Sequence, residues 1–519
     1  MRHSFTFLLR LVCIFPLVFG TTPAVFHWPD PAIDSMDEIL YRPNNGVGIL
    51  TTVCNARNNS SIAAQWLRIA YHDMATHDSV AGTGGLDASI MFELDRPQNI
   101  GLGMLLSLDD FALSPNEHVA MADIIAMGVI NALIGCGGPI VPFRGGRIDA
   151  TEAGPETVPE PQQDLASHTA AFARQGFNAT EMISLVACGH SLGGVRQADF
   201  PLVVTEDVPT GVQLFASKIG FDPKVVTEYL DSTTQNVLVV GSNVTTRSDM
   251  RIFFSDGNVT MQSMASADKF NQICGDLIER MINTVPSTVT LTDPIEPIDF
   301  KVWNTVLYPQ DGSLTLLTTM RIINSSLKST VTLFWKERTG TFCPAAGCSV
   351  PSFQVQSAQP SFLAALKGVT GYTMHSFNAS IDLATSISYF WFEVTNNDGS
   401  APVIINNQGA NFTIDQDVLL FVPPRTTFTS AGLDMVVAVK DLSGTVDVTS
   451  TTTLHGNASV PIPSTVTSNF ELDSSIPAAD GYTFYSASIS SASLSNTVHA
   501  TIDGTAYSLW VPQPLAGVA

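Results

Sequence analysis

The 519-residue chain has little positive charge and few charged residues of either sign. Lys and Arg number 24 against 47 Asp and Glu, which gives a net charge of −23 at pH 7 and a pI near 4.6. A surface of this sign repels nucleic acid and anionic membranes, so neither is expected as a partner. Cationic or neutral molecules approach such a surface more favourably. The fold does not follow from the net charge.

No segment after the first twenty residues looks like a transmembrane span, and the sequence has no C-x-x-C pair that would suggest a structural zinc site. The apolar run Phe5–Phe19 follows Arg2, is interrupted by Arg10 and Pro16, and is shorter than the roughly 20 residues that span a bilayer. Small residues come next. This pattern predicts a secretory signal peptide over residues 1–20, with a membrane anchor as the alternative.

The cysteines and the glycosylation motifs also favour an exported, extracellular protein. Without Cys13 in the signal segment, six cysteines remain, and an even number in an exported chain suggests three disulfides. Cys343 and Cys348 are close enough in sequence to pair locally, and the sequence alone leaves the other connectivities open. Nine N-x-Ser/Thr sequons mark candidate glycosylation sites: Asn58, Asn59, Asn178, Asn243, Asn258, Asn324, Asn378, Asn411 and Asn457.

The chain changes character near residue 286. Before this point, long segments rich in Ala, Leu, Ile and Met have helical periodicity, at residues 61–77, 118–134, 164–177 and 267–285. After it, Thr, Ser and Val alternate in short runs at residues 287–294, 314–323, 329–337, 386–394, 417–424, 435–442 and 482–491. We therefore expect a mostly α domain over residues 21–286 and an all-β, β-sandwich-like domain, or two smaller ones, over residues 287–519. The first β-prone run could instead be a linker.

One segment of the first domain carries a pattern suited to chemistry. Arg68 and His72 are four residues apart, so they share a face if the segment is helical. The pair places a permanent cation beside a proton acceptor. Heterolytic cleavage of hydrogen peroxide on iron needs this combination, because a base must move a proton between the two oxygens while a cation stabilises the departing one. The alternative for an isolated pair of this kind is a solvated helix face.

The segment Arg68-x-x-Tyr71-His72-Asp73 resembles the distal motif of the plant, fungal and bacterial haem peroxidase superfamily. Further pieces resemble the family's motifs and follow in its order: residues 84–102, 122–150 with its Gly-Arg-x-Asp loop, 184–196, and 247–256 followed by the segment 270–282. The resemblance covers about residues 45–285. It is to the secreted fungal branch, class II, or to the ascorbate and cytochrome c peroxidases.

The resemblance implies a haem b cofactor, with His190 as its iron ligand. Asp249 is expected to accept the other ring N–H of His190 and so to make the imidazole more electron-rich. Asn99, together with a neighbouring acid such as Glu93, is expected to hold His72 in the correct tautomer. Arg68, His72 and Asn99 are thus the expected catalytic residues.

Some pocket residues depart from the family pattern. Tyr71 stands where relatives usually carry Phe or Trp, and Phe215 stands in place of a tryptophan; both are expected at the cofactor. Residues that bind manganese, ascorbate or lignin-type donors in relatives have no counterparts, as Ala64 and Leu185 illustrate. The expected reaction is therefore the oxidation of small phenols or aromatic amines by hydrogen peroxide in one-electron steps.

The resemblance also extends to a metal site and to the disulfides. Four residues match positions that hold a distal calcium ion in the secreted branches: Asp73, Gly85, Asp87 and Ser89. Oxygen ligands of this kind suit calcium, and ordinary loop capping is the alternative. Cys54 and Cys136 resemble a bridge of the fungal branch. A disulfide is also expected for Cys188, with Cys274 as its candidate partner.

Two other functions compete with this prediction. Residues 189–193 match G-x-S-x-G, the nucleophile-elbow motif of α/β-hydrolases, with Ser191 as nucleophile and the preceding MISLVAC as a buried strand. His375, His455 or His499 could then complete a serine-esterase triad. The second alternative is a cell-wall binding protein on a peroxidase scaffold, whose β domain binds a polysaccharide.

Overall fold

The computed structural model describes residues 31–43, 54–325, 328–345, 347–429, 432–441, 445–454, 456, 462–490 and 493–512. The predicted signal peptide and the sequon at Asn457 lie outside these residues. Among the described residues, no helix is both long enough and apolar enough to cross a membrane.

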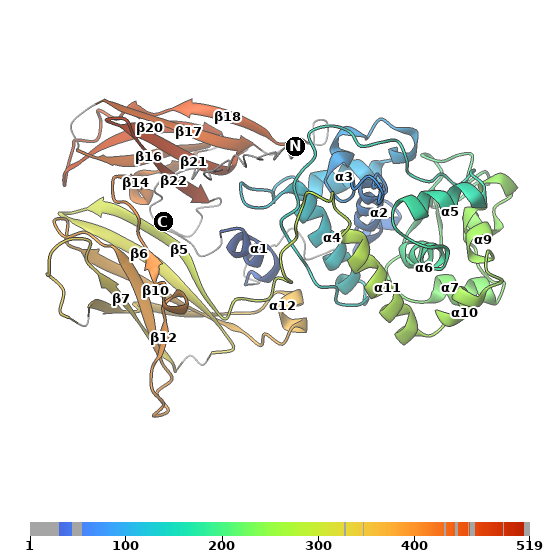
Figure 1. Ribbon diagram of the computed structural model, residues 1–519, viewed down its shortest axis with the longest axis horizontal. Helices are drawn as coiled ribbons and strands as arrows, with labels where there is room; N and C mark the ends of the chain where they lie inside the picture. Colours follow the sequence, from blue (N-terminus) through green and yellow to red (C-terminus); the bar gives the residue numbers. More distant parts are fainter. Residues whose placement is uncertain are drawn as a thin grey trace, which may run out of the picture.

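Helices fill the N-terminal half and strands the C-terminal half (Figure 1). The helices are α1 Pro31–Tyr41, α2 Ile62–Met74, α3 Leu102–Phe111, α4 Met121–Gly135, α5 Leu165–Arg174, α6 Ala179–Gly189, α7 Lys224–Leu230, α8 Val237–Val240, α9 Ser248–Phe253, α10 Val259–Ser263, α11 Ala267–Ile282 and α12 Phe362–Leu366. The strands of the N-terminal half are β1 Ala56–Arg57, β2 Ser60–Ser61, β3 Gly194–Arg196 and β4 Val212–Leu214. The four helices predicted from periodicity are confirmed as α2, α4, α5 and α11.

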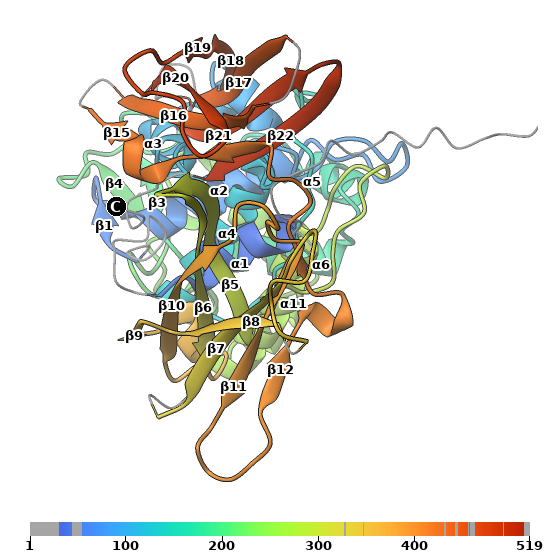
Figure 2. The same ribbon diagram turned by 90° about the vertical axis from the view of Figure 1, so that its left-hand side faces the viewer.

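Within the described residues, the strands of the C-terminal half form four sheets, ordered β5-β6-β10-β9, β12-β11-β7-β8, β14-β16-β20-β19 and β18-β17-β21-β22. Their bounds are β5 Phe300–Gln310, β6 Ser313–Ile323, β7 Thr330–Lys336, β8 Cys348–Pro351, β9 Gln354–Ala358, β10 Tyr372–Ile381, β11 Tyr389–Thr395, β12 Val403–Ile405, β13 Phe412–Thr413, β14 Leu419–Phe421, β15 Thr427–Phe428, β16 Gly432–Lys440, β17 Val446–Leu454, β18 Ser464–Asn469, β19 Glu471–Leu472, β20 Tyr482–Ser490, β21 Ser493–Ile502 and β22 Thr505–Pro512. Figure 2 shows the sheets grouped into two layered units, one above the other, with the helices behind them. The prediction of a β region is confirmed, and the sheets follow the second of the two alternatives, two smaller units.

Turn chemistry fixes the register of two of these hairpins. β5 and β6 are joined by Asp311-Gly312, and β21 and β22 by Asp503-Gly504. All four residues have a positive φ, between 48° and 81°. An Asp-Gly pair in this conformation favours the tight turn whose twist matches that of antiparallel strands.

The segment after the last helix of the N-terminal half is a linker. Residues 287–299 form no strand, and they run along the helical region. Thr292 and Ile295 donate their N–H groups to the carbonyls of Gly145 and Phe143, at 3.0 and 2.8 Å. The interpretation of residues 287–294 as a first strand is therefore wrong, because these residues hydrogen-bond to a loop and not to a neighbouring strand.

The first helix ties the two halves together. α1 belongs by position to the predicted N-terminal domain, yet its fully buried Asp37 is paired with cations from the first sheet. Arg321 Nη2 lies 2.7 Å and Lys301 Nζ 3.1 Å from Asp37 Oδ1. Removing one partner from a buried pair of this kind costs about 3–5 kcal/mol. The boundary at residue 286 is thus bridged by a buried charge cluster.

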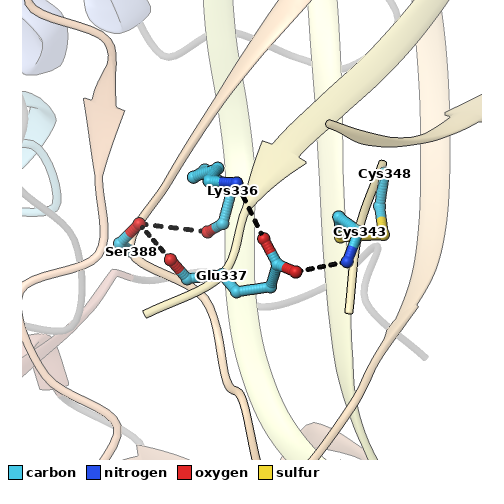
Figure 3. The surroundings of a disulfide bond; sticks show 5 residues. All are labelled: Lys336, Glu337, Cys343, Cys348 and Ser388. Carbon is cyan, nitrogen blue, oxygen red and sulfur yellow. Dashed lines mark hydrogen bonds and ion pairs between the residues drawn. A yellow bond between two sulfur atoms is a disulfide. The ribbon is translucent and has the colours of Figure 1, made fainter. Parts of the chain in front are cut away.

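All six described cysteines form disulfides, as Cys54–Cys136, Cys188–Cys274 and Cys343–Cys348. The local pair closes a loop after β7 (Figure 3). Glu337 accepts the backbone N–H of Cys343 and pairs with Lys336 at 3.2 Å, while Ser388 donates to the Glu337 carbonyl at 3.0 Å. The bonded loop is therefore fixed to strand β7 and to the residue that precedes β11.

Candidate active site

A cavity of about 820 Å³ lies within the helical half. Its walls bring together residues from both ends of the predicted motif series: Arg68, Tyr71 and His72 from α2, and His190, Phe215 and Asp249 from the segments around α6 and α9. Most of the remaining lining is apolar, with Leu67, Phe172, Leu185 and Leu238 among it. A cavity of this size and character is typical of a small-molecule or cofactor site.

Helix α2 forms one wall because its two faces differ. Ser61 caps its N-terminus by accepting the N–H of Ala64 at 3.2 Å. The buried face includes Trp66, Ala70 and Met74, and the Trp66 ring lies 5.0 Å from that of Phe111 at the end of α3. The opposite face carries Arg68 and His72 into the cavity.

The hydrogen bonds of His72 define its tautomer. Asn99 Nδ2 donates to the Glu93 carbonyl at 3.1 Å, so its Oδ1 is the atom that faces His72 Nδ1, at 2.8 Å. His72 Nδ1 must then carry the proton, which leaves Nε2 as a free acceptor. Burial, together with the neighbouring Arg68, lowers the pKa of His72 to about 3, so the ring is neutral at neutral pH. His72 is thus prepared to accept a proton.

Arg68 is held on the same wall by backbone carbonyls. Its Nη2 donates to Gln98 O and Ile100 O, both at 3.1 Å, and the guanidinium lies 5.4 Å from the Phe200 ring centre. Burial lowers the pKa of Arg68 to about 10, and the Asp199 carboxylate opposes this shift. The side chain therefore keeps its charge at neutral pH in a fixed position.

His190 caps the C-terminal end of α6 on a different wall and has a different partner. Its Nδ1 donates to Asp249 Oδ2 at 2.9 Å, and the Asn236 side chain donates to the same oxygen at 2.7 Å. The Phe215 ring stacks on His190, with 4.3 Å between ring centres. Within the described residues Nε2 of His190 has no partner. An imidazole oriented by a buried carboxylate, with its second nitrogen free, is a typical metal ligand.

Tyr71 lies on the same cavity wall as His72, as predicted. It lines the cavity beside His72, and its ring stacks on Phe172 with 5.9 Å between centres. Tyr71 and Phe215 thus lie on the walls that carry His72 and His190, where the sequence placed them. Their contribution to cofactor binding remains a prediction.

The residues predicted for calcium lie together at the end of α2. Ser89 Oγ is 3.5 Å from Asp73 Oδ1, and the Ser89 N–H donates to Asp87 Oδ1 at 3.2 Å. Asp73 also accepts backbone N–H groups, and Gly85 accepts the N–H of Asp87. These bonds are those expected of loop capping. Among the described residues no cluster of three or more His, Cys, Asp or Glu side chains could hold a metal, so calcium remains a prediction.

The serine-hydrolase interpretation is contradicted by the structure. The MISLVAC segment lies in helix α6, not in a strand. Ser191 is fully buried and its hydroxyl donates to the Cys188 carbonyl at 2.8 Å. His375 lies in β10 and His499 in β21, in the other half of the chain, and His455 lies outside the described residues. Ser191 is therefore a structural residue at a helix end.

Two residues at the site were not predicted from the sequence. Asn236 lies in no recognised motif, yet it shares Asp249 with His190. Asp199 lines the cavity near Arg68. The single available signal was their position, since Asp199 comes nine residues after His190 and Asn236 shortly before Asp249.

The peroxidase family model matches residues 51–263. This segment contains α2, the free acceptor nitrogen of His72 and the His190–Asp249 pair. The helical half is a domain of the haem peroxidase superfamily.

The relatives include proteins that match the peroxidase domain alone and a protein with a longer match. A "WSC domain-containing protein" of Arthroderma benhamiae is 35% identical over an alignment of 399 residues that covers 72% of this chain and 54% of that protein. L-ascorbate peroxidase 5 of Arabidopsis thaliana is 30% identical over 193 residues, 36% of this chain and 64% of the plant protein. Mitochondrial cytochrome c peroxidase of Cryptococcus neoformans is 29% identical over 144 residues, 26% of this chain and 37% of the relative. The first match is longer than the peroxidase domain, so it extends into the strand-rich half.

Proposed function

We propose that the chain is a secreted haem peroxidase that uses hydrogen peroxide to oxidise small organic donors, phenols or aromatic amines, in one-electron steps. The main observation behind this proposal is the arrangement of one cavity. One wall holds a neutral, proton-accepting His72 beside Arg68, and another holds a His190 oriented by Asp249. Pairing of all six described cysteines supports export.

The residues of the cavity fit haem b. His190 Nε2 would ligate the iron, and Asp249 would make this imidazole more electron-rich. Arg196 lines the same cavity, and its side chain has no hydrogen-bond or ion-pair partner within the described residues, so it suits a carboxylate of the cofactor. Haem, when bound, supplies the iron centre at which the peroxide O–O bond is cleaved and the oxidising equivalents are held.

His72 and Arg68 would act on the peroxide. Nε2 of His72 accepts the proton of one peroxide oxygen and returns it to the other, which leaves as water. Arg68 stabilises the negative charge that develops on the departing oxygen. Asn99 keeps the imidazole in the tautomer that this transfer requires. Two donor molecules each lose one electron and one proton, which complete the second water.

The stoichiometry of turnover tests the proposal. The full chain loaded with haem should oxidise two molecules of a phenol such as guaiacol for each peroxide consumed. Oxidation without peroxide, or consumption of peroxide without donor oxidation, would contradict it.

For the calcium ion, we propose the oxygen ligands of Asp73, Asp87 and Ser89 together with the Gly85 carbonyl. If this ion is bound, a chelator should lower the thermal stability of the protein.

Polysaccharide binding by the strand-rich half remains a separate proposal. Its aromatic side chains are largely engaged in packing: the Trp391 ring stacks on Phe334 at 5.5 Å, and Trp510 packs against His118 at 5.0 Å. Sedimentation of the protein with insoluble fungal wall glucan or chitin would test it.

A further inference from the structure

Asp199 is a carboxylate in the cavity wall that the proposed mechanism does not use. It lines the same cavity as Arg68 and His72. Within the described residues its side chain has neither a hydrogen-bond partner nor an ion-pair partner. The carboxylate is partly exposed in a mostly apolar wall, so it is free to pair with a molecule bound in the cavity.

The backbone at Gly101 leaves room for this carboxylate. Gly101 has a φ of +117°, which side-chain-bearing residues rarely adopt. A Cβ at this position would lie 2.8 Å from Asp199 Oδ2 and 3.5 Å from Arg68 Nη1. Glycine therefore allows the carboxylate and the guanidinium to approach the same point of the wall.

Asp199 forms no direct ion pair with the nearby cations in the described part of the chain, although its carboxylate acts on the Arg68 guanidinium at longer range. Arg68 directs its Nη2 to the carbonyls of Gln98 and Ile100, and no ion pair within 4.0 Å joins it to Asp199 in the described part of the chain. Arg196, on the same segment, is the residue assigned above to the cofactor's carboxylate. The negative charge of Asp199 thus remains available to a bound molecule.

Asp199 is itself partly exposed, and so are its neighbours in the wall. Leu202, three residues further along, lines the cavity and is 76% exposed. Leu102, next to Gly101, also lines it and is 38% exposed. The part of the wall that carries Asp199 is therefore accessible from solvent.

We propose that Asp199 is a specificity-determining residue that selects aromatic donors carrying a protonated amine. The inference rests on the proposed peroxidase function and names its substrate class. An ammonium group would donate a charge-assisted hydrogen bond to the free carboxylate, whereas an anionic donor would be repelled. The net charge of −23 acts in the same direction at the encounter stage.

Three phenols with one reacting group and different charges test this assignment: tyramine, which is cationic, 4-ethylphenol, which is neutral, and 3-(4-hydroxyphenyl)propionate, which is anionic. Asp199→Asn should lower kcat/KM for tyramine about fivefold, leave the neutral phenol unchanged and raise the value for the anionic one. The rate of reaction with peroxide is measured separately, because Asp199 also acts electrostatically on Arg68. Glu206→Gln is the matched control, because it removes an exposed acid of the same segment that does not line the cavity.

Two results would overturn the assignment. One is an unchanged ratio of tyramine to propionate turnover in Asp199→Asn. The other is an equal loss with all three phenols together with a slower peroxide reaction, which would make Asp199 a positioning residue for Arg68. Calorimetric binding of the same phenols to the haem-loaded protein measures the preference without turnover. Failure of the wild type to react with peroxide would therefore overturn the proposed function, while the binding ratio still decides the role of Asp199.

Discussion

The two walls of the cavity use the same side chain with different partners. His72 faces the neutral amide of Asn99 at 2.8 Å, whereas His190 faces the buried carboxylate of Asp249 at 2.9 Å. An amide fixes the tautomer without adding charge, so the imidazole stays neutral and can take up and release a proton. A carboxylate increases the electron density of the ring, which suits a metal ligand. The partner therefore determines what each histidine can do.

The largest effect is expected from removal of the proton acceptor. His72→Leu should retain haem and lower the rate of reaction with peroxide by about 10²- to 10⁴-fold, because no other described group is placed to move the proton. Stopped-flow absorption measures this rate. His190→Ala is the contrasting variant and should lose haem affinity instead. Unchanged peroxide kinetics in His72→Leu would contradict the assignment of His72 as the proton acceptor.

A neutral partner for His190 should have the next largest effect. Asp249→Asn removes the carboxylate and should weaken haem binding by about 10- to 100-fold, since partners of metal-bound histidines contribute on this scale. It should also raise the reduction potential of the iron. Both are measured on purified protein by haem transfer and by spectroelectrochemistry. An unchanged potential would show that Asp249 does not act on the ligand.

The converse exchange places a carboxylate on the distal side. The pKa of His72 is lowered to about 3, so the wild-type reaction with peroxide should be independent of pH between about 5 and 8. Asn99→Asp supplies an opposite charge, which raises this pKa and protonates the ring at acid pH. The rate should then fall toward pH 5. Identical pH profiles for the two proteins would contradict the role assigned to the neutral amide.

A fully buried histidine in the strand-rich half, His375, sharpens the comparison because its ring has no hydrogen-bond partner. His375 in β10 is fully buried, neither ring nitrogen makes a hydrogen bond, and burial lowers its pKa below the ordinary value of 6.5. The unfolded chain then binds more protons between the two pKa values. The free energy of unfolding should therefore fall as the pH drops below about 6.5 and level off below the folded pKa.

His375→Phe should reduce this acid sensitivity, with a smaller effect than the variants above and none on peroxide reactivity. Urea unfolding of the full chain between pH 8 and 5 measures it. His499 is a suitable control position, because β21 belongs to a different sheet. An equal pH dependence in wild type and His375→Phe would show that protonation of His375 is not what destabilises the fold in acid.

The sequence predicted the elements that local pattern determines. The helices α2, α4, α5 and α11 follow from apolar periodicity, and the spacing of Arg68 and His72 placed both on one face. His190 and Asp249 are 59 residues apart, and their pairing was predicted only through the family resemblance. Local signals and ordered motifs thus sufficed for most of the cavity.

Contacts between residues far apart in the sequence, and side chains without a partner, could not be predicted in this way. Asp37 meets Arg321 across 284 residues, and nothing in either segment indicates the other. The fold brings Asn236 to Asp249 and Asp199 to the cavity wall, and no sequence pattern marks either position. An unpaired carboxylate likewise has no sequence signature. The segment before His190 was ambiguous, because a short apolar run suits a buried strand or a helix until its contacts are known.

The absorption spectrum of the purified mature protein, before and after one equivalent of hydrogen peroxide, tests the central claim most directly. With haem supplied during folding, we expect a Soret band that shifts on addition of peroxide and recovers when a phenol is added. Absence of a haem band under these conditions would contradict the assignment of His190 as an iron ligand, and with it the proposed function.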